Sequence, residues 1–165
     1  MPLHTQLIVK NNHRSIGLIE GPKGSFVSDE RSRGFKQYLK SLKKIKLITE
    51  KGFFTYEGGY QAAEKILKNK KISAIFCADD TMAFGSLDYI KKNTNLKIPK
   101  QVELIGYDDI SMSNWKSYDL TTVRQPIRQM SKLVTQLIDE FIQDPDYESI
   151  NHIVKGRLVK RRTTR

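Results

Sequence analysis

The sequence predicts an α/β protein built on a doubly wound parallel sheet with helices on both faces. Short apolar runs of strand length recur along the chain, and segments with helical spacing of apolar residues separate them. Strands joined through a helix run parallel with right-handed crossovers, so helices cover both faces of the sheet. Runs such as AIFCA are apolar throughout, as expected of strands that are buried on both sides.

Strands and helices are expected to alternate in the first two thirds of the chain. The expected strands are Ser15–Ile19, Ile45–Thr49, Ser73–Ala78 and Val102–Tyr107. Helical stripes lie between them at Phe35, Tyr38, Leu39 and Leu42, at Ala62, Ala63, Ile66 and Leu67, and at Met82, Ala83, Ser86, Leu87 and Ile90. The element order is therefore β-α-β-α-β-α-β.

One more helix and three short strands are expected after these elements. LTTV (Leu120–Val123) predicts a strand, and Pro126 suits the first turn of a helix because its φ is already helical. That helix should end near Asp144, since Pro145 cannot continue it. Its apolar face comprises Met130, Leu133, Val134, Leu137 and Phe141, and the last strands are expected near Ile150–Val154 and Arg157–Lys160.

Length and composition exclude several classes of protein. A chain of 165 residues is long enough for one domain with a sizeable core. No apolar run approaches the ~20 residues that cross a bilayer, so we expect no membrane partner. The first residues do not resemble a secretory signal, which predicts a cytoplasmic location. The single cysteine, Cys77, suits a reducing compartment.

The chain is strongly basic, with a formal net charge of +11. Six basic residues fall between Lys155 and Arg165 without an acid among them. Such a tail can bind nucleic acid through its phosphates, but we prefer to interpret it as a solvated end. No helix-turn-helix, zinc-ligand spacing or RNA-binding signature supports direct nucleic-acid recognition.

Catalytic signatures are mostly absent. Gly21–Ser25 lacks the spacing of a phosphate loop and is interpreted as a turn. Cys77 lies within an apolar strand, where a cysteine behaves as a small hydrophobe. His4, His13 and His152 lie in unrelated segments without metal-ligand spacing. We therefore expect no metal, no cofactor and no enzymatic activity. The enzyme alternative is a small α/β hydrolase or a response-regulator-like phosphoacceptor using Asp79, Asp80 or Asp108, whose carboxylates could form an acidic Mg²⁺ site.

Position in the predicted sheet points to a binding site. Ligands of open parallel sheets bind beyond the carboxyl ends of the strands. The residues there are Glu20–Ser25, Phe53, Phe54, Asp79, Asp80, Asp108 and Asp109. Carboxylates accept hydrogen bonds from hydroxyls, and Arg31 could add a guanidinium fork. We favour Asp79 and Asp108 for the site and interpret Asp80 as a helix N-cap.

Two aromatic residues could anchor an interface. Phe84 is predicted on the far side of its helix from the stripe Ala83, Ser86, Leu87 and Ile90, so it should be exposed. Trp115, in the segment SMSNWKS, is open to two interpretations, local packing or an interface anchor.

Taken in order, seven motifs resemble the effector-binding core of the lactose-repressor (LacI/GalR) family of bacterial transcription regulators. The motifs are HRSIGLIEGP (13–22), ERSRGFKQYL (30–39), GGYQAAEKIL (58–67), AIFCADDTMAFGSL (74–87), IPKQVELIGYDDI (98–110), LTTVRQP (120–126) and LVKRRTT (158–164). They span nearly the whole chain in the family's order. Each motif is weak alone, but seven in register are specific.

The resemblance implies a periplasmic-binding-protein-like fold with two α/β subdomains that close on a small effector. It divides residues 1–165, a truncated effector-binding domain, into a C-terminal subdomain core (13–123), a crossover helix (124–144) that normally packs on the absent N-terminal subdomain, and returning strands with the basic tail (145–165). The family's DNA-binding headpiece and hinge helix are not represented. Whether Met1 is a natural start stays open.

The resemblance also assigns roles to individual residues. Arg31 matches an arginine that grips effector hydroxyls or carboxylate, Phe54 an aromatic that stacks on the ligand, and Asp108 an aspartate that accepts from hydroxyls. Asp79 stands where the family commonly has asparagine, and Phe84 matches a dimer-interface position. Tyr118–Asp119 replaces the prolines that usually precede LTTV.

From these observations we expect an effector-sensing, dimerising part of a transcription regulator. Its partners would be a sugar or nucleoside-like effector, a second copy of the chain, and operator DNA through the missing headpiece. A solute-binding protein of a sugar transporter, which shares the fold, is the alternative.

Overall fold

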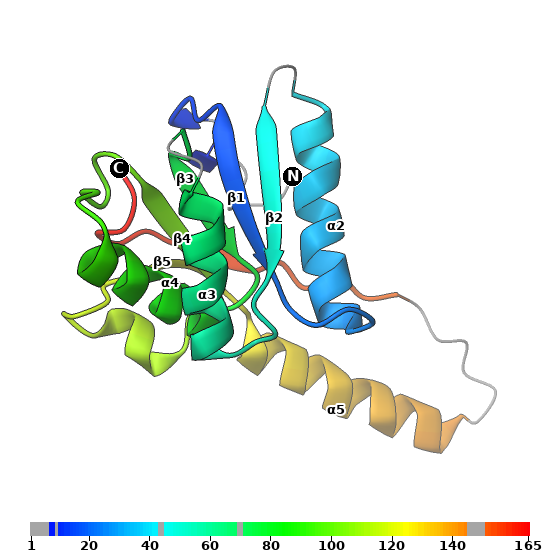
Figure 1. Ribbon diagram of the computed structural model, residues 1–165. Helices are drawn as coiled ribbons and strands as arrows, with labels where there is room; N and C mark the ends of the chain where they lie inside the picture. The colour runs from blue at the N-terminus through cyan, green and yellow to red at the C-terminus, as the bar shows by residue number, and fades with distance from the viewer. Residues whose placement is uncertain (1–6, 9, 43–44, 69–70, 145–150) are drawn as a thin grey trace.

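The computed structural model describes residues 7–8, 10–42, 45–68, 71–144 and 151–165, which form an α/β fold around a six-stranded sheet (Figure 1). The strands are β1 (Ser15–Glu20), β2 (Lys46–Lys51), β3 (Ala74–Cys77), β4 (Glu103–Asp108), β5 (Thr121–Arg124) and β6 (Arg157–Val159). Their order is β2-β1-β3-β4-β5-β6, and β6 alone pairs antiparallel. The predicted fold class is confirmed.

Among the described residues, four α-helices and one short 3₁₀ helix connect the strands. They are α2 (Phe26–Lys40), α3 (Tyr56–Leu67), α4 (Asp80–Asn93), η1 (Ser111–Asn114) and α5 (Ile127–Gln143). Ser25 caps the start of α2 and Thr55 that of α3, and their side chains accept hydrogen bonds from backbone N–H groups of the first turn. These local signals agree with the apolar stripes that predicted the helices.

The sheet is buried on both faces, as the apolar strands predict. On one face, Ile16, Leu18 and Phe76 pack with α2 residues such as Phe35, whose ring lies 4.8 Å from that of Phe76. On the other face, strand residues including Ile75 pack with α3 and α4. Alternate residues of one strand therefore serve two separate cores, which accounts for the apolar sequence of β3 and of the centre of β1, whereas the edge strand β2 keeps polar residues.

Phe84 is buried, so the prediction that it is exposed is wrong. Its side chain is 2% exposed, and its ring lies 4.3 Å from that of Tyr118. α4 is covered by the sheet, by α3 and by the loop before β5 that carries Tyr118. The prediction from one apolar stripe fails because it assumes that only the sheet covers α4. The reason to choose Phe84 as an exposed interface anchor is therefore removed.

The last two segments also differ from expectation. Residues 151–154 form no strand, and residue 150 lies outside the described residues. The basic end is not a solvated tail, since Thr163 and Thr164 are 2% and 4% exposed. Thr121 N–H donates to Thr163 Oγ1, and Arg165 pairs with the buried Glu103. The predicted helix α5 is present, but none of its residues is buried.

Asp80 joins four elements at the edge of the sheet where the parallel strands end. Its Oδ2 atom accepts hydrogen bonds from Ser113 Oγ at 2.6 Å and from the Ile110 N–H at 3.1 Å. Its Oδ1 atom accepts from Thr122 Oγ1 at 2.5 Å. Gly106 leaves room for this carboxylate, because a β-carbon there would overlap Asp80 Oδ1. The side chain thereby connects α4, η1, β5 and the loop after β4.

Removing this carboxylate should destabilise the fold. Asp80→Ala leaves two buried hydroxyls and one N–H without their acceptor, and we expect a loss of about 2–4 kcal/mol in the free energy of unfolding at neutral pH. Urea unfolding followed by circular dichroism measures it. Asp139→Ala, on the exposed α5, is the control and should change stability by less than about 0.5 kcal/mol. Equal effects of both changes would show that Asp80 does not hold the edge.

Candidate functional site

The carboxyl ends of the five parallel strands meet at one edge of the sheet, here called the carboxyl edge. β1 lies between β2 and β3 in the sheet, so the chain leaves β1 in one direction and returns past it in the other. This reversal creates a crevice beyond the ends of β1 and β3, where ligands of doubly wound sheets bind. Of the predicted ligand-binding residues, Asp79 follows β3 and Phe54 follows β2. Arg31 lies on α2, which follows β1, and Asp108 is the last residue of β4.

Arg31 and Asp108 are brought into direct contact. Arg31 Nη2 donates to Asp108 Oδ1 at 2.8 Å, and Nη1 donates to Asp108 Oδ2 at 3.3 Å and to the Ala78 carbonyl at 2.7 Å. The side chains are 12% and 23% exposed, respectively. A two-pronged pair of this kind fixes both groups in orientation. The fork from α2 thus spans the ends of β3 and β4 and still faces solvent in part.

Two residues that the sequence reasoning missed complete this pair. The Arg31 guanidinium lies 4.0 Å from the centre of the Tyr107 ring, a cation–π contact that holds the fork from the side. Gln125 Nε2 donates to Asp108 Oδ1. The positional rule could have found Gln125, because it directly follows β5. Tyr107 has no comparable signal, since it lies within the β4 run.

Phe54 lies at the same edge, after β2. Its half-buried ring packs against Gly21 in the loop after β1, where a β-carbon would overlap it. Phe53 and Phe54 both have positive φ, 56° and 59°, and so does Asp108, with φ 120°. Such backbone is costly for residues other than glycine and is typically found at functional sites. The strained backbone therefore indicates a functional site at this edge independently of which residue types lie there.

Asp79, not Asp80, is the N-cap of α4, so that interpretation is corrected. Asp79 Oδ1 accepts from the Met82 N–H at 2.8 Å, and the residue is 8% exposed. Burial raises the pKa of Asp79 to about 6, and the nearby charges of Asp108 and Asp80 act in the same direction. The helix therefore holds a carboxyl group at the site that accepts a proton easily.

Other charged groups of the edge have structural partners. Asp109 pairs with Arg124 and with Arg161, and its side chain is 2% exposed. Burial alone would raise the pKa of Glu20, but hydrogen bonds from Lys36 and Lys51 outweigh it, so the pKa is lowered. The negative charges of Asp109 and Glu20 are therefore balanced by neighbouring basic side chains. Burial also raises the pKa of the Cys77 thiol, which keeps it an inert core group.

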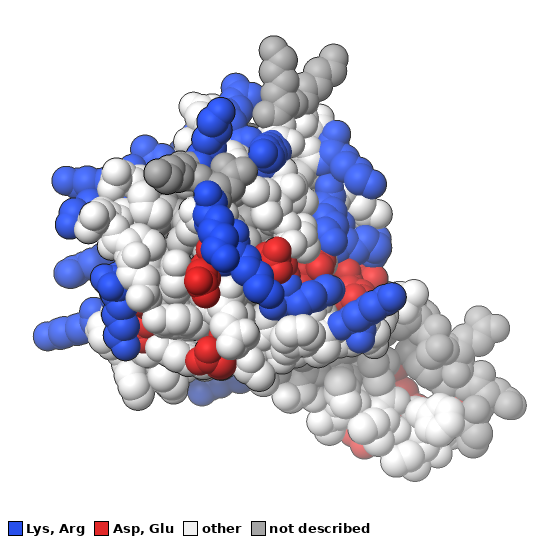
Figure 2. Space-filling model, in the orientation of Figure 1, with Lys and Arg blue, Asp and Glu red and all other residues white. Residues whose placement is uncertain are grey.

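The positive charge does not form one uninterrupted patch on the face seen in Figure 2. Lys and Arg side chains are spread over that face, with acidic side chains between them.

Trp115 follows η1, and its side chain is 53% exposed. Within the described part of the chain, no group of three or more His, Cys, Asp or Glu side chains is placed to hold a metal ion. None of its helices combines the length and apolar character that a bilayer crossing requires.

The raised pKa of Asp79 gives a pH-dependent prediction. Its pKa rises from 3.8 to about 6 on folding. The free energy of unfolding therefore falls as pH rises from about 4 through about 6, because the folded state resists the loss of this proton. Below about 4 the carboxyl group is protonated in both states, and Asp79 costs no stability. Asp79→Asn keeps a good N-cap and should be more stable than the parent by about 1–3 kcal/mol at pH 7. The difference should vanish near pH 4.

Urea unfolding from pH 4 to 7.5 measures this difference. Asp29→Asn, on an exposed side chain of α2, is the control and should shift stability by less than about 0.5 kcal/mol throughout. A stability gain in Asp79→Asn that does not depend on pH would contradict the assignment.

Comparisons with known proteins agree with this geometry. The profile of the periplasmic binding protein-like domain matches residues 5–164. The HTH-type transcriptional repressor PurR of Vibrio vulnificus is 31% identical over 167 residues, covering 99% of this chain and 49% of the repressor. The chain thus spans about half the length of this curated relative.

Two solved structures show the same fold. The lac repressor dimer bound to operator and an anti-inducer has a TM-score of 0.89 at 27% identity, covering 98% of this chain and 56% of that one. A LacI-family regulator from Enterococcus faecium with bound ribose has a TM-score of 0.83 at 27% identity, covering 98% and 60%. The chain therefore belongs to the periplasmic-binding-protein-like family, on its LacI branch.

Proposed function

We propose that this chain is the effector-binding part of a transcription regulator and that its carboxyl edge binds a hydroxyl-bearing ligand, a sugar or nucleoside. The single observation that carries this proposal is the partly exposed pair of Arg31 and Asp108 at the crevice, with side chains 12% and 23% exposed. A guanidinium offers donors and a carboxylate offers acceptors, which is the complement that vicinal hydroxyls need. Phe54 at the same edge supplies an aromatic surface for the apolar face of a ring.

The exposed apolar surface supports the proposal that a second subdomain forms the opposite wall of the crevice. Large apolar side chains stand around the carboxyl edge on the segments after four strands: Phe26 (80% exposed), Phe53 (58%), Ile110 (40%) and Ile127 (63%). Along α5, Met130, Val134, Ile138 and Phe141 are also exposed. Apolar surface of this extent usually has a partner. We infer that it packs against an N-terminal subdomain, which agrees with relatives of twice the length.

The relatives favour regulation over the alternatives. PurR is a transcriptional repressor, and the lac repressor structure contains operator and an anti-inducer. A solute-binding protein of a transporter is therefore less well supported, although it shares the fold. In our proposal operator DNA is bound by a separate headpiece, and the ligand acts by closing two subdomains around Arg31 and Asp108. The site then needs no catalytic group or cofactor.

Removal of either half of the pair should weaken effector binding. We expect Arg31→Ala and Asp108→Asn each to lower affinity about tenfold or more for any sugar or nucleoside that binds, because each removes charge-assisted hydrogen bonds. Calorimetric titration with pentoses, hexoses and nucleosides measures this.

The matched control for this titration is Arg33→Ala. Arg33 lies on the same helix and is exposed, and its partners Glu30 and Gln37 are neighbours on that helix. Its removal should leave affinity unchanged. Binding that survives both Arg31→Ala and Asp108→Asn would overturn the site assignment.

We further propose that the chain forms a homodimer and that Trp115 contributes to the interface. The lac repressor, a structural relative, is a dimer. Trp115 is 53% exposed on the short segment between η1 and β5, and the same segment carries Tyr118, which covers Phe84. This segment is therefore held firmly against α4, and it presents a large ring to solvent.

Trp115→Glu should shift the chain toward monomer, because it places a charge in an apolar contact and opens no core cavity. Sedimentation equilibrium measures the shift, with circular dichroism to verify the fold. Ile153→Glu is the control, since Ile153 is 88% exposed and lies away from this segment in the sequence. An oligomer that is unaffected by Trp115→Glu would exclude Trp115 from the interface.

A further inference from the structure

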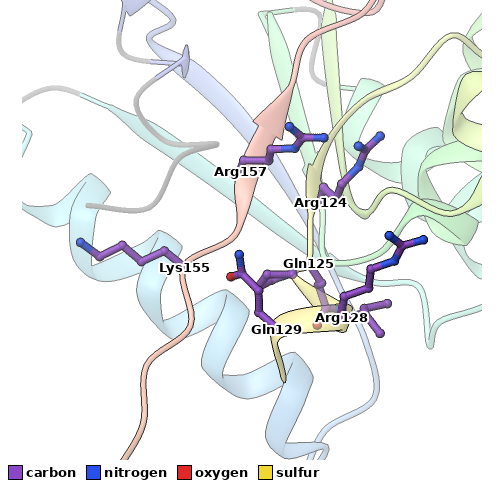
Figure 3. A pocket seen from close by; sticks show the side chains of 8 residues that line it. Arg124, Gln125, Arg128, Gln129, Lys155 and Arg157 are labelled. Carbon is purple, nitrogen blue, oxygen red and sulfur yellow. The ribbon is translucent and has the colours of Figure 1, made fainter. Parts of the chain in front are cut away.

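A pocket rich in arginine lies next to the proposed effector wall. Its volume is about 520 Å³, and it lies between the start of α5 and the segment that leads into β6 (Figure 3). The polar side chains that line it are Arg124, Gln125, Arg128, Gln129, Lys155 and Arg157. No carboxylate is among its described lining residues. We call this cavity the arginine pocket.

The strand pairing places two of these arginines opposite each other. β5 and β6 are antiparallel, with Arg124 in register with Arg157. Like charges directly across a strand pair repel and destabilise the pairing unless an anion offsets them. Asp109 pairs with Arg124 but is shared with Arg161. Within the described residues Arg157 has no ion pair, so one side of the cross-strand pair is not compensated.

A third guanidinium extends the positive charge onto α5. Figure 3 shows the guanidinium groups of Arg124, Arg128 and Arg157 gathered toward the same side of the view, while the ammonium group of Lys155 points away from them. Arg128 and Arg157 are both exposed, and neither forms an ion pair with another described residue. Two forks from two elements, α5 and β6, are therefore available to a ligand that carries several acceptor oxygens.

The beginning of α5 adds to the positive potential. No side chain caps this helix at Pro126, and its first turn carries no acidic residue. By contrast, α2, α3 and α4 each have a side-chain cap and an acid in the first turn. Free N–H groups at a helix start attract anions and act together with nearby basic side chains. The start of α5 thus adds to the positive potential of the arginines, on which the proposed site mainly depends.

Gln125 connects the arginine pocket to the effector wall. It lines the pocket, and its Nε2 atom donates to Asp108, the carboxylate that Arg31 holds. A ligand whose hydroxyls lie on Asp108 would therefore have the pocket beside it. Planar guanidinium forks match the tetrahedral oxygens of phosphate, and a dianion is the ligand that two unpaired arginines would neutralise.

We propose that the arginine pocket binds a phosphate monoester and that the effector is a phosphorylated sugar, with hydroxyls on Asp108 and phosphate between Arg128 and Arg157. The hydroxyl half of this statement rests on the proposed function, whereas the phosphate half stands on the pocket alone. Inorganic phosphate offers the same chemistry and is the second source that the experiment must separate.

The pocket is tested first with inorganic phosphate, titrated calorimetrically into the 165-residue chain at low ionic strength. Arg128→Gln and Arg157→Gln should each weaken binding about tenfold or more, because each removes a charge-assisted contact. Lys160→Gln is the matched control: it removes the same charge from an exposed position just after β6, outside the pocket, and should change affinity less than about twofold. Equal losses in all three variants, or none, would overturn the phosphate site.

The effector is tested with ribose against ribose 5-phosphate and glucose against glucose 6-phosphate. At least one phosphorylated sugar should bind about tenfold or more tightly than its neutral form, and Arg157→Gln should remove that advantage. Asp108→Asn should weaken the sugar phosphate but should not weaken inorganic phosphate, because it removes an acceptor for hydroxyls and no positive charge from the pocket. Circular dichroism verifies that each variant is folded.

The remaining outcomes distinguish the two proposals. If neutral sugars bind as tightly as their phosphates and depend on Asp108, the arginine pocket is not an effector subsite, while the proposed function stands. If inorganic phosphate binds through Arg157 and no sugar phosphate binds more tightly, the pocket holds a free anion and the assignment of a phosphorylated effector is wrong.

Discussion

A single buried carboxylate holds together the edge of the sheet on which the binding site depends. Asp80 accepts hydrogen bonds from η1, from β5 and from the loop after β4. Burial raises its pKa, and the hydroxyls of Ser113 and Thr122 oppose that shift by stabilising the charge. Because parallel strands end at the same edge, one acceptor at the start of α4 can tie several strand ends together. The loops that carry ligand-binding groups are thereby kept in a defined arrangement.

The candidate site is built on this support. With the β4 and β5 ends fixed, Asp108 can hold a strained backbone conformation and still meet Arg31 from α2 and Gln125 from the segment after β5. Donors from two separate parts of the chain therefore converge on one carboxylate. Preorganised donors and acceptors lose little entropy when a ligand binds, which suits a sensor of a small hydrophilic molecule.

The fold could be predicted from the sequence because its signals are local, whereas the site could be predicted only in part. Apolar strands and helical stripes predict the element order, and the rule for strand ends finds Asp108, which does meet Arg31, the guanidinium expected from the first full helix. The tertiary cover of α4 leaves no local signal, so the sequence wrongly predicts that Phe84 is exposed. The choice between Asp79 and Asp80 as the cap depends on partners more than 30 residues away, such as Ser113 and Thr122. The ordered end of the chain depends in the same way on Thr121 and Glu103.

The ligand-binding role of the carboxyl edge is tested most directly by mapping backbone amide chemical shifts in the chain as a ligand is added. With a sugar or sugar phosphate that binds, shift changes should concentrate at the carboxyl edge, at Gly21, Arg31, Phe54 and Asp108. Residues at the opposite ends of the strands, such as Ser73 and Glu103, should serve as unaffected internal references. Shift changes centred on those residues or on the outer surface of α3, with none at the carboxyl edge, would contradict the central claim that this edge is the ligand-binding wall.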